Sequence, residues 1–508
     1  MTKTKKVFLW ASILGVVLFA LGALGWVFHD QLLSFWNQTV FSHSKNSPKG
    51  VPRRISTTGR LREAKSLMGN GYFSLATVEL QNAIRENPES PEPYRALGEV
   101  YLRTQDMTKL QNLIKELGKI FPGDPEIPVL KGRKLIAEQN FQEASTFFRQ
   151  TKGPLSPSLH FYQAVLAALQ NNHAGAQQIL SDIASLPVKK DTLTPAASED
   201  TASVPPELAE KVQGMLDAYE TFQDLSEGQN PHLFALLGKV LAEKNEATLA
   251  QKFAEVAIKE DVSYIDAWIV RGYANMQMGK IDAALEDLRH AYDLDPLRPQ
   301  THYFLALALD KAGKTDEAIL FFEKSLEHNF EFSDEVRWKL VDLFSRGGKY
   351  DRVVELYREL LNSESEPTEY VRAMHTAIDI LKQPEVALEF ADRLIKEKPD
   401  DAFSLNMHGW ALVVNKKFIQ AEKDLKEALD LEPENPRTFL NLGLLAEEQA
   451  EFEKAKEFYK KSYEMGKTRT DELSVSLTNA AAERYNSLMS KIEHPEEPAA
   501  EENPKNSP

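Results

Sequence analysis

Small and apolar residues recur with a period of 34 residues between positions 231 and 469 of this 508-residue chain. Each window holds two segments of about 13 residues with apolar residues at helical spacing, separated by a turn rich in Gly, Lys and Asn. A fixed period of this length predicts helical hairpins stacked into a solenoid, because each repeat buries its apolar face against its neighbours. The seven windows begin at Pro231, Ile265, Pro299, Asp334, Thr368, Ala402 and Pro436, with one inserted residue before Asp334.

Three positions within the window carry the information about packing. The eighth residue is Gly or Ala in five windows and the twentieth is Ala in six, so that paired helices can approach closely. Proline stands at the thirty-second position of three windows, where it ends the second helix. In these features the chain resembles the tetratricopeptide repeat family, and this resemblance implies an all-α, right-handed α-solenoid. The residues concerned are Gly238, Gly272, Ala306, Gly409 and Gly443, then Ala250, Ala284, Ala318, Ala387, Ala421 and Ala455, then Pro296, Pro399 and Pro433.

A second array precedes the first. Residues 57–186 contain about four windows, of which the last two keep fewer pattern positions. Residues 187–206 are rich in Ser, Thr, Ala and Pro, so we expect a disordered linker between the two arrays. The remaining segments are a connecting helix over 207–230, the seven-repeat array over 231–469, a capping helix over 470–492 and a disordered acidic tail over 493–508.

Residues 7–28 form an uncharged apolar run of 22 residues, which spans about 33 Å as a helix. The run predicts a single transmembrane helix, with a cleaved signal peptide as the alternative. Lysines precede it within residues 1–6, whereas residues 29–44 contain no Lys or Arg. The N-terminus is therefore expected in the cytoplasm and the repeats, after a tether over 29–56, in the periplasm of a bacterial cell.

Composition narrows the function classes. The chain has 60 basic and 76 acidic residues and a net charge of −16, which argues against nucleic acid as a partner. It contains no cysteine, and its 11 histidines show no metal-ligand spacing. No nucleophile is paired with a base, and almost no chain remains for a catalytic domain. We therefore expect a protein that is not an enzyme, with no cofactor and no metal.

The resemblance also implies a working surface, because in such repeats positions 2, 5, 9 and 12 of each first helix point into a groove. Aromatic side chains are common among these residues, and rigidly held aromatic rings anchor partner chains well. The alternative is that Trp338 and Trp410 only pack against neighbouring helices. The family's carboxylate clamp needs Lys and Asn at successive groove positions, and these do not line up here. The predicted groove residues are Tyr273, Tyr303, Trp338, Arg372, Phe403, Asn406, Trp410 and Arg437.

These features favour a membrane-anchored, non-enzymatic scaffold or adaptor that binds partner proteins in bacterial envelope assembly, polysaccharide export or secretion. A precursor-import receptor with cytosolic repeats is an alternative, against which the missing clamp residues count. A glycan-binding protein of an exopolysaccharide system is another, since aromatic rings can stack on sugars. The residues do not name the partner.

Overall fold

The computed structural model describes residues 56–69, 71–151, 156–189, 203–224, 230–362, 364–467 and 472–493. The predicted transmembrane helix, nearly all of its tether and the tail beyond residue 493 lie outside these ranges. Within them, every helix is too short or too polar to cross a bilayer. The described residues are helical apart from turns and one isolated β-bridge, and they belong to two compact units that divide after Asp124.

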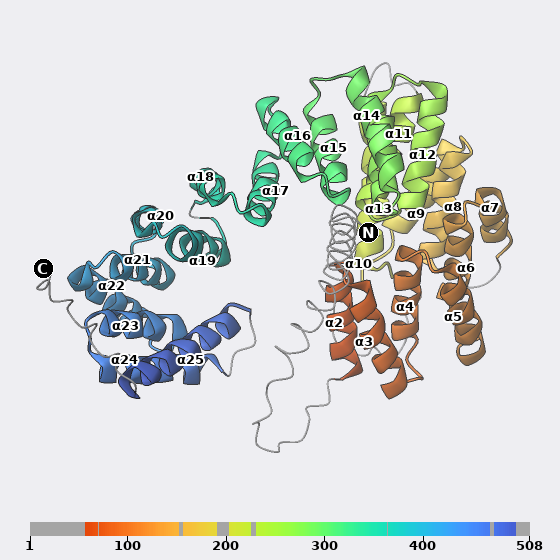
Figure 1. Ribbon diagram of the computed structural model, residues 1–508. Helices are drawn as coiled ribbons and strands as arrows, with labels where there is room; N and C mark the ends of the chain where they lie inside the picture. The colour runs from red at the N-terminus through yellow and green to blue at the C-terminus, as the bar shows by residue number, and fades with distance from the viewer. Residues whose placement is uncertain are drawn as a thin grey trace, which may run out of the picture. The chain divides into compact units, whose positions relative to one another are not determined.

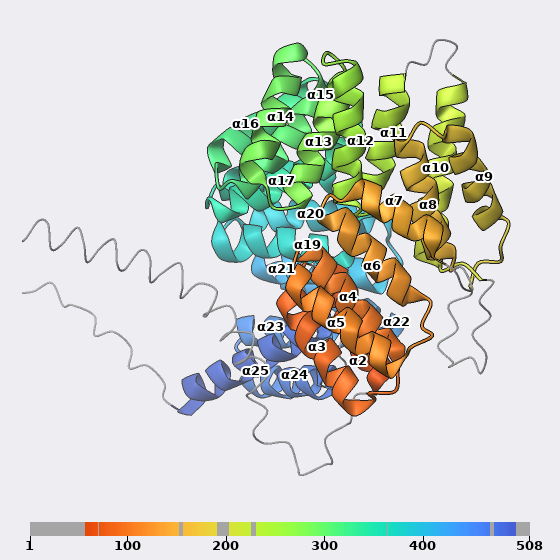
Figure 2. The ribbon, with the colours of Figure 1, turned by 90° about the vertical axis from the view of Figure 1, so that its right-hand side faces the viewer.

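Unit 1 contains two helical hairpins, seen side by side in both ribbon views (Figures 1 and 2). Its helices pack in chain order, each against the next, around buried residues such as Tyr94, Leu110 and Leu117. Arg95 closes the unit through an ion pair of 3.0 Å with the carboxylate of Asp124. The helices are α2 (Thr57–Gly69), α3 (Phe73–Glu86), α4 (Pro91–Arg103) and α5 (Met107–Ile120).

Unit 2 is by itself a longer stack of antiparallel helical pairs, part of which, α11 to α16, can be followed in Figure 1. Its first part comprises α6 (Glu126–Ala137), α7 (Phe141–Gln150), α8 (Pro157–Leu169), α9 (His173–Ala184) and the single helix α10 (Pro206–Gln223). The repeat windows then form α11 (Asn230–Glu243), α12 (Ala247–Glu260), α13 (Ile265–Gln277), α14 (Ile281–Leu294), α15 (Pro299–Lys311), α16 (Thr315–Glu327), α17 (Ser333–Arg346) and α18 (Tyr350–Leu360). The stack ends with α19 (Pro367–His375), a π-helical turn (Thr376–Ile380), α20 (Pro384–Glu397), α21 (Ala402–Val414), α22 (Phe418–Leu431), α23 (Pro436–Glu448), α24 (Phe452–Gly466) and α25 (Glu472–Glu493).

In the windows that begin at Ile265, Ala402 and Pro436, the glycine at the eighth position faces a large residue at the twenty-fourth. A Cβ atom built on Gly409 falls 2.6 Å from Leu425, and one built on Gly443 falls 2.4 Å from the ring of Tyr459. Real Cβ atoms do not approach carbon this closely, so only glycine permits the observed separation of the two helices. The close approach expected from the sequence is therefore what sets the width of the hairpins that have glycine at the eighth position.

Each hairpin turn of the seven-repeat array has one residue in the left-handed region, always at the fifteenth position of the window. Three of these residues are glycines, and Asn245 has a φ of 62°. The turn after α11 shows the consequence, because the N–H of Glu246 donates to Leu241 O at 2.8 Å and that of Asn245 to Ala242 O at 3.1 Å. These bonds satisfy carbonyl groups at the end of the first helix and stop it there. The residues are Asn245, Gly279, Gly313, Gly348, Lys382, Lys416 and Ala450.

The described ends of the segment predicted as a linker over 187–206 pair with each other. Lys189 N–H donates to Val204 O at 2.8 Å and Val204 N–H donates to Pro187 O at 2.9 Å, which forms an isolated bridge. One buried apolar cluster extends from Val129 to Ala274 across this segment, and α10 packs against both α9 and α11. The two compact units divide after Asp124, and the helices on either side of the linker belong to the same unit, where the apolar face of α10 joins them.

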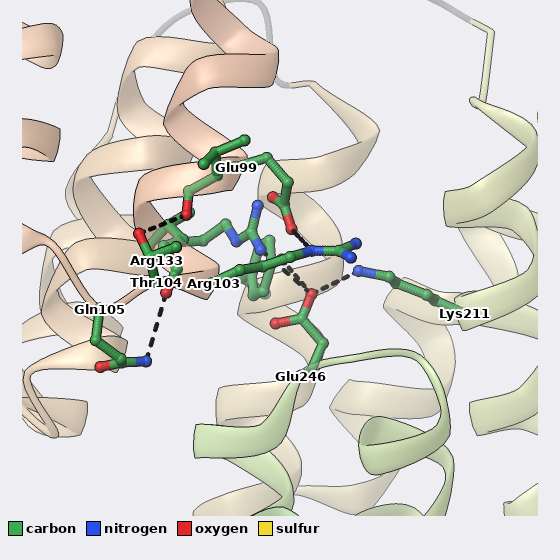
Figure 3. Close-up of polar contacts among 10 residues, drawn as sticks. Glu99, Arg103, Thr104, Gln105, Arg133, Lys211 and Glu246 are labelled. Carbon is green, nitrogen blue, oxygen red and sulfur yellow. Dashed lines mark hydrogen bonds and ion pairs between the residues drawn. The ribbon is translucent and has the colours of Figure 1, made fainter. Parts of the chain in front are cut away.

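A buried carboxylate joins four elements of unit 2 (Figure 3). Glu246, 8% exposed, lies in the turn between α11 and α12. Its Oε1 accepts a hydrogen bond of 2.7 Å from Tyr162 Oη on α8 and one of 2.5 Å from Lys211 Nζ on α10, and it lies 3.8 Å from Arg133 Nη2 on α6. The guanidinium of Arg133 also lies 5.5 Å from the centroid of the Tyr162 ring. The negative charge at the turn therefore holds side chains that lie 35, 84 and 113 residues earlier in the chain.

His408 on α21 bridges two carboxylates of neighbouring helices. Its Nδ1 lies 2.6 Å from Asp424 on α22 and its Nε2 lies 2.9 Å from Asp392 on α20. Burial disfavours the charged imidazolium, but the bonds to Asp424 and Asp392 outweigh burial and raise the pKa of His408. Only the imidazolium can donate from both nitrogens at once.

This bridge predicts a pH-dependent stability. Because the pKa of His408 is higher in the folded chain, its contribution is fully present below the unfolded pKa of about 6.5 and is lost as the pH rises through the folded pKa. We expect urea unfolding to show wild type more stable than His408→Gln at about pH 6, with a smaller difference at about pH 9. A difference that stays constant with pH would contradict the bridge.

Candidate partner-binding site

The first helices of neighbouring repeats contact one another in two groups of unit 2. Helix α11 packs against α13, α13 against α15, α19 against α21 and α21 against α23, in addition to the contacts within each hairpin. We call the surface formed by α11, α13, α15, α17, α19, α21 and α23 the first-helix face. The groove residues predicted from the sequence all belong to these helices.

A cavity of about 210 Å³ opens on the first-helix face between α11, α13 and α15. Leu236, Ile269, Tyr273 and Phe304 form much of its apolar wall, and the Tyr273 and Phe304 rings are 5.2 Å apart. Burial raises the pKa of the Tyr273 hydroxyl, which is therefore neutral at physiological pH. The polar groups of the lining come from His232, Lys239, Glu243, Tyr264, Asp266 and Gln300.

Three of the polar side chains beside this cavity, those of His232, Tyr264 and Asp266, make a hydrogen bond or an ion pair with a neighbour. His232 and Tyr264 share a hydrogen bond between Nδ1 and the hydroxyl, and Arg298 pairs with Asp266. Burial is the main cause that raises the pKa of Tyr264 to about 12. The cavity is thus an apolar recess with a fixed polar margin, and it can accept an apolar side chain of a ligand.

Tyr303, at the fifth position of its window, was predicted to point into the groove, but the structure buries it. Its side chain is only 6% exposed, its ring stacks on Phe330 at 4.7 Å, and its hydroxyl donates to Glu335. Burial, followed by the carboxylate of Glu335, raises the pKa of the Tyr303 hydroxyl. Tyr303 therefore forms part of the packed wall beneath the first-helix face.

Trp338 and Arg372 occupy the middle of the first-helix face. Trp338 is half-buried, with its ring edge-on to Tyr357 at 5.9 Å, and Arg372 is exposed. Trp410 is 7% exposed, and its ring lies 4.8 Å from that of His375. Of these three predicted residues, Arg372 and Trp338 offer surface to a partner, whereas Trp410 mainly packs between helices.

The remaining predicted residues gather where α21 meets α23. The guanidinium of Arg437 lies 5.5 Å from the ring centroid of half-buried Phe403. Asn406 is fully buried, and its Nδ2 donates to Ala402 O at 2.8 Å and to Thr438 Oγ1 at 3.0 Å. Asn441 Nδ2 donates in turn to Asn406 O at 3.1 Å. The structure therefore brings Phe403, Asn406 and Arg437 together, although the sequence could only place them on neighbouring repeats.

The family model for the tetratricopeptide repeat matches residues 269–334 and 406–469. These two segments of the chain therefore match tetratricopeptide repeats. The peroxisomal targeting signal receptor of Candida albicans is 24% identical over 240 residues, which cover 44% of this chain and 38% of that one. A tetratricopeptide repeat-containing protein of Methanocaldococcus jannaschii is 31% identical over 123 residues, covering 23% of this chain and 21% of that one. The chain thus spans less than two fifths of the length of these curated relatives.

Among solved structures, yeast Tom70 is 16% identical with a TM-score of 0.26, covering 86% of this chain and 96% of that one. The C-terminal part of a repeat protein from Cytophaga hutchinsonii is 12% identical with a TM-score of 0.35, covering 48% of this chain and 98% of that one.

The sequence prediction missed two residues that line the cavity, and their positions within the 34-residue windows explain why. Leu236 and Phe304 both stand at the sixth position, which the groove prediction did not include, and both line the cavity. Large apolar residues at this position of two nearby windows are the signal that could have found them. In contrast, Tyr303, at the neighbouring fifth position, is buried and packs against Phe330 beneath the first-helix face.

Proposed function

We propose that this protein is a non-enzymatic adaptor that binds a segment of a partner protein on the first-helix face of its seven-repeat array. The observation that carries the proposal is the apolar cavity between α11, α13 and α15, which has room for one apolar side chain. Tetratricopeptide repeats over 269–334 and 406–469 support protein recognition as the general role. Exposed Arg372 and half-buried Trp338 extend the binding surface beyond the cavity.

We also propose that the adaptor is anchored in the bacterial inner membrane by residues 7–28, with its repeats in the periplasm. There it would serve envelope assembly, polysaccharide export or secretion. Support comes from the apolar run of 22 uncharged residues and from the lysines that precede it.

The proposed topology predicts the behaviour of a reporter fused after residue 60. Alkaline phosphatase, which is active only in the periplasm, should be active in this fusion, whereas a β-galactosidase fused at the same place should be inactive. The matched control is a fusion after residue 6, before the apolar run, where the two activities should be reversed. Cytoplasmic activity of the fusion after residue 60 would contradict the topology and would favour repeats in the cytosol.

Leu236→Glu should strongly weaken binding of a partner segment, because it places a carboxylate on the wall of the cavity. We expect peptides selected on the wild-type chain from a random library to bind Leu236→Glu about 100-fold more weakly, since a buried unpaired charge costs several kcal/mol. Isothermal titration calorimetry measures this change.

The matched control is Leu320→Glu on α16, where the leucine is 50% exposed and lies away from the cavity. This variant should bind the same peptides as tightly as wild type. Equal affinities of wild type and Leu236→Glu, with both proteins folded by circular dichroism, would place the binding site elsewhere.

A further inference from the structure

Helix α3 of unit 1 leaves three large apolar side chains in solvent. Tyr72, the residue before its first turn, is 59% exposed, and Leu75 and Val78 are 51% and 50% exposed. They recur every three residues and so follow one side of the helix, while another side packs into the unit through Ala76 and Leu80, which are fully buried. Neighbouring exposed apolar side chains of this size mark an interaction surface.

The packing of the repeats does not require this apolar side. Counted from Thr57, Tyr72 and Val78 stand at the sixteenth and twenty-second positions of the first window. The seven-repeat array has only Lys, Glu or Gln at the sixteenth position, and it has Lys or Glu at the twenty-second position apart from Leu320. Second helices of this chain therefore normally present polar residues where α3 presents apolar ones.

A basic residue continues the same side of α3. Four residues follow the spacing of three, four and three residues that places side chains on one face of a helix: Leu75, Val78, Asn82 and Arg85. Arg85 is exposed, and its Nη2 donates to Asn82 Oδ1. Because Arg85 takes part in no ion pair of the described residues, its charge is available to a partner.

The two compact units differ in the sign of their charge. Residues 1–124 contain 16 basic and 10 acidic residues, a net charge of +6, whereas residues 125–508 contain 44 and 66, a net charge of −22. The positive charge is densest over residues 45–65, with seven basic residues and one acidic residue. Of these, Arg62 and Lys65 on α2 are exposed and outside any ion pair of the described residues. A partner of unit 1 is therefore expected to carry negative charge.

A bilayer that contains anionic phospholipids combines an apolar interior with a negative surface, which are the two properties that α3 and its surroundings require. The proposed anchor also places a bilayer near this helix. It ends at residue 28, and α2 begins at Thr57, so 28 residues separate them. A chain of this length without regular structure spans about 30 Å, which leaves unit 1 within reach of the membrane surface.

We propose that α3 lies in the plane of the membrane surface, with Tyr72, Leu75 and Val78 between the lipid headgroups and Arg85 against the phosphate of an anionic phospholipid. The phenol ring of tyrosine suits this layer, because one end is apolar and the other is polar. The basic residues over 45–65 strengthen the attraction. This inference rests on the membrane anchor of the proposed function and adds a second contact with the bilayer, separate from the first-helix face.

The natural chain contains no cysteine, so a single introduced cysteine carries a fluorescent label at one known position. The experiment compares Val78→Cys with the control Leu320→Cys, because both residues are 50% exposed and both stand at the twenty-second position of a window. Each full-length variant is inserted in nanodiscs of phosphatidylcholine, either alone or mixed with phosphatidylglycerol. Quenching is measured with nitroxide-labelled lipid, which acts inside the bilayer, and with acrylamide, which acts in water.

On the anionic discs we expect nitroxide lipid to quench the Val78 label at least about threefold more than the Leu320 label, because only the first enters the headgroup layer. Acrylamide should show the reverse order. Removing phosphatidylglycerol, or adding Arg85→Glu to Val78→Cys, should bring the two labels closer together, since both changes weaken the electrostatic attraction. Leu75→Glu should have the same effect, and because both residues are exposed, circular dichroism should be unchanged.

The anchor and the docking of α3 can fail separately. Retention of the chain on the discs in high salt reports on the anchor, because salt screens headgroup attraction and leaves a spanning helix in place. A chain that is retained but whose two labels respond equally to nitroxide lipid would refute the docking and leave the anchor intact. A Val78 label that is shielded from acrylamide but not quenched by nitroxide lipid would also overturn the inference, because protein would then cover α3. Loss of the chain in high salt, with the Val78 label still quenched at low salt, would refute the anchor and support the docking.

Discussion

Replacing Gly132 with alanine is expected to lower the free energy of unfolding by about 3 kcal/mol, at the upper end of the usual cost of overpacking. A Cβ atom on Gly132 falls 2.0 Å from Phe148 Cζ and within 2.6 Å of two further ring atoms. The ring cannot swing away easily, because Phe148 is fully buried and lies between Phe147 and Tyr162, with ring centroids at 5.8 and 6.0 Å. Helices α6 and α7 must therefore move apart. Urea unfolding followed by far-ultraviolet circular dichroism measures the loss.

The matched control is Gly118→Ala on α5. A Cβ atom at this position meets nothing within 4 Å, so the change should be neutral or should stabilise the helix by up to about 1 kcal/mol. The double variant Gly132→Ala with Phe148→Leu should lose less than the sum of the single changes, because the smaller side chain relieves the clash. If both glycine variants had the same stability, the close approach would not be a constraint on the fold.

Glu246→Ala is expected to destabilise the chain by about 3 kcal/mol, which is the usual cost of removing one partner of a buried ion pair. The change removes an acceptor from Tyr162 and Lys211 and leaves two cations, Lys211 and Arg133, beside each other with side chains only 21% and 16% exposed. Glu246→Gln should lose less, because its amide oxygen can still accept from Tyr162 Oη. Urea unfolding at neutral pH gives both values.

An exposed ion pair supplies the comparison for Glu246. Glu355 pairs with Arg352 on α18 at 2.7 Å, and both side chains are more than half exposed. Glu355→Ala should change the stability by less than about 0.5 kcal/mol, because water screens such pairs. A similar loss for Glu246→Ala and Glu355→Ala would show that the buried carboxylate does not hold the helices of unit 2 together.

The buried glutamate also illustrates what sequence patterns cannot predict. Its position in the hairpin turn follows from the 34-residue period, but nothing in that period indicates that residues from α6, α8 and α10 converge on it. Those contacts depend on how the stack winds over several repeats. The same limit applies to α10. Its apolar residues could be found in the sequence, but the helices that they pack against, α9 and α11, could not.

The predicted groove residues fall into an accessible and a buried group, and the sequence did not distinguish the two groups. Tyr273 borders the cavity and Arg372 is exposed, whereas Tyr303 and Trp410 are almost fully buried. All four stand at positions that point toward the same side of a helix. Small rotations between successive repeats decide which of them reaches the surface, and a one-dimensional pattern carries no information about those rotations.

By itself the sequence determined that the chain is a stack of helical hairpins, since the period, the small eighth residue and the turn residues act within one hairpin and are governed by local sterics. Only the tertiary structure decided where compact units divide, which sixth-position side chains enclose the cavity, and which apolar residues of α3 stay exposed. The physical reason is that burial and electrostatics depend on neighbours from several repeats at once, whereas helix formation depends mainly on residues close in the chain.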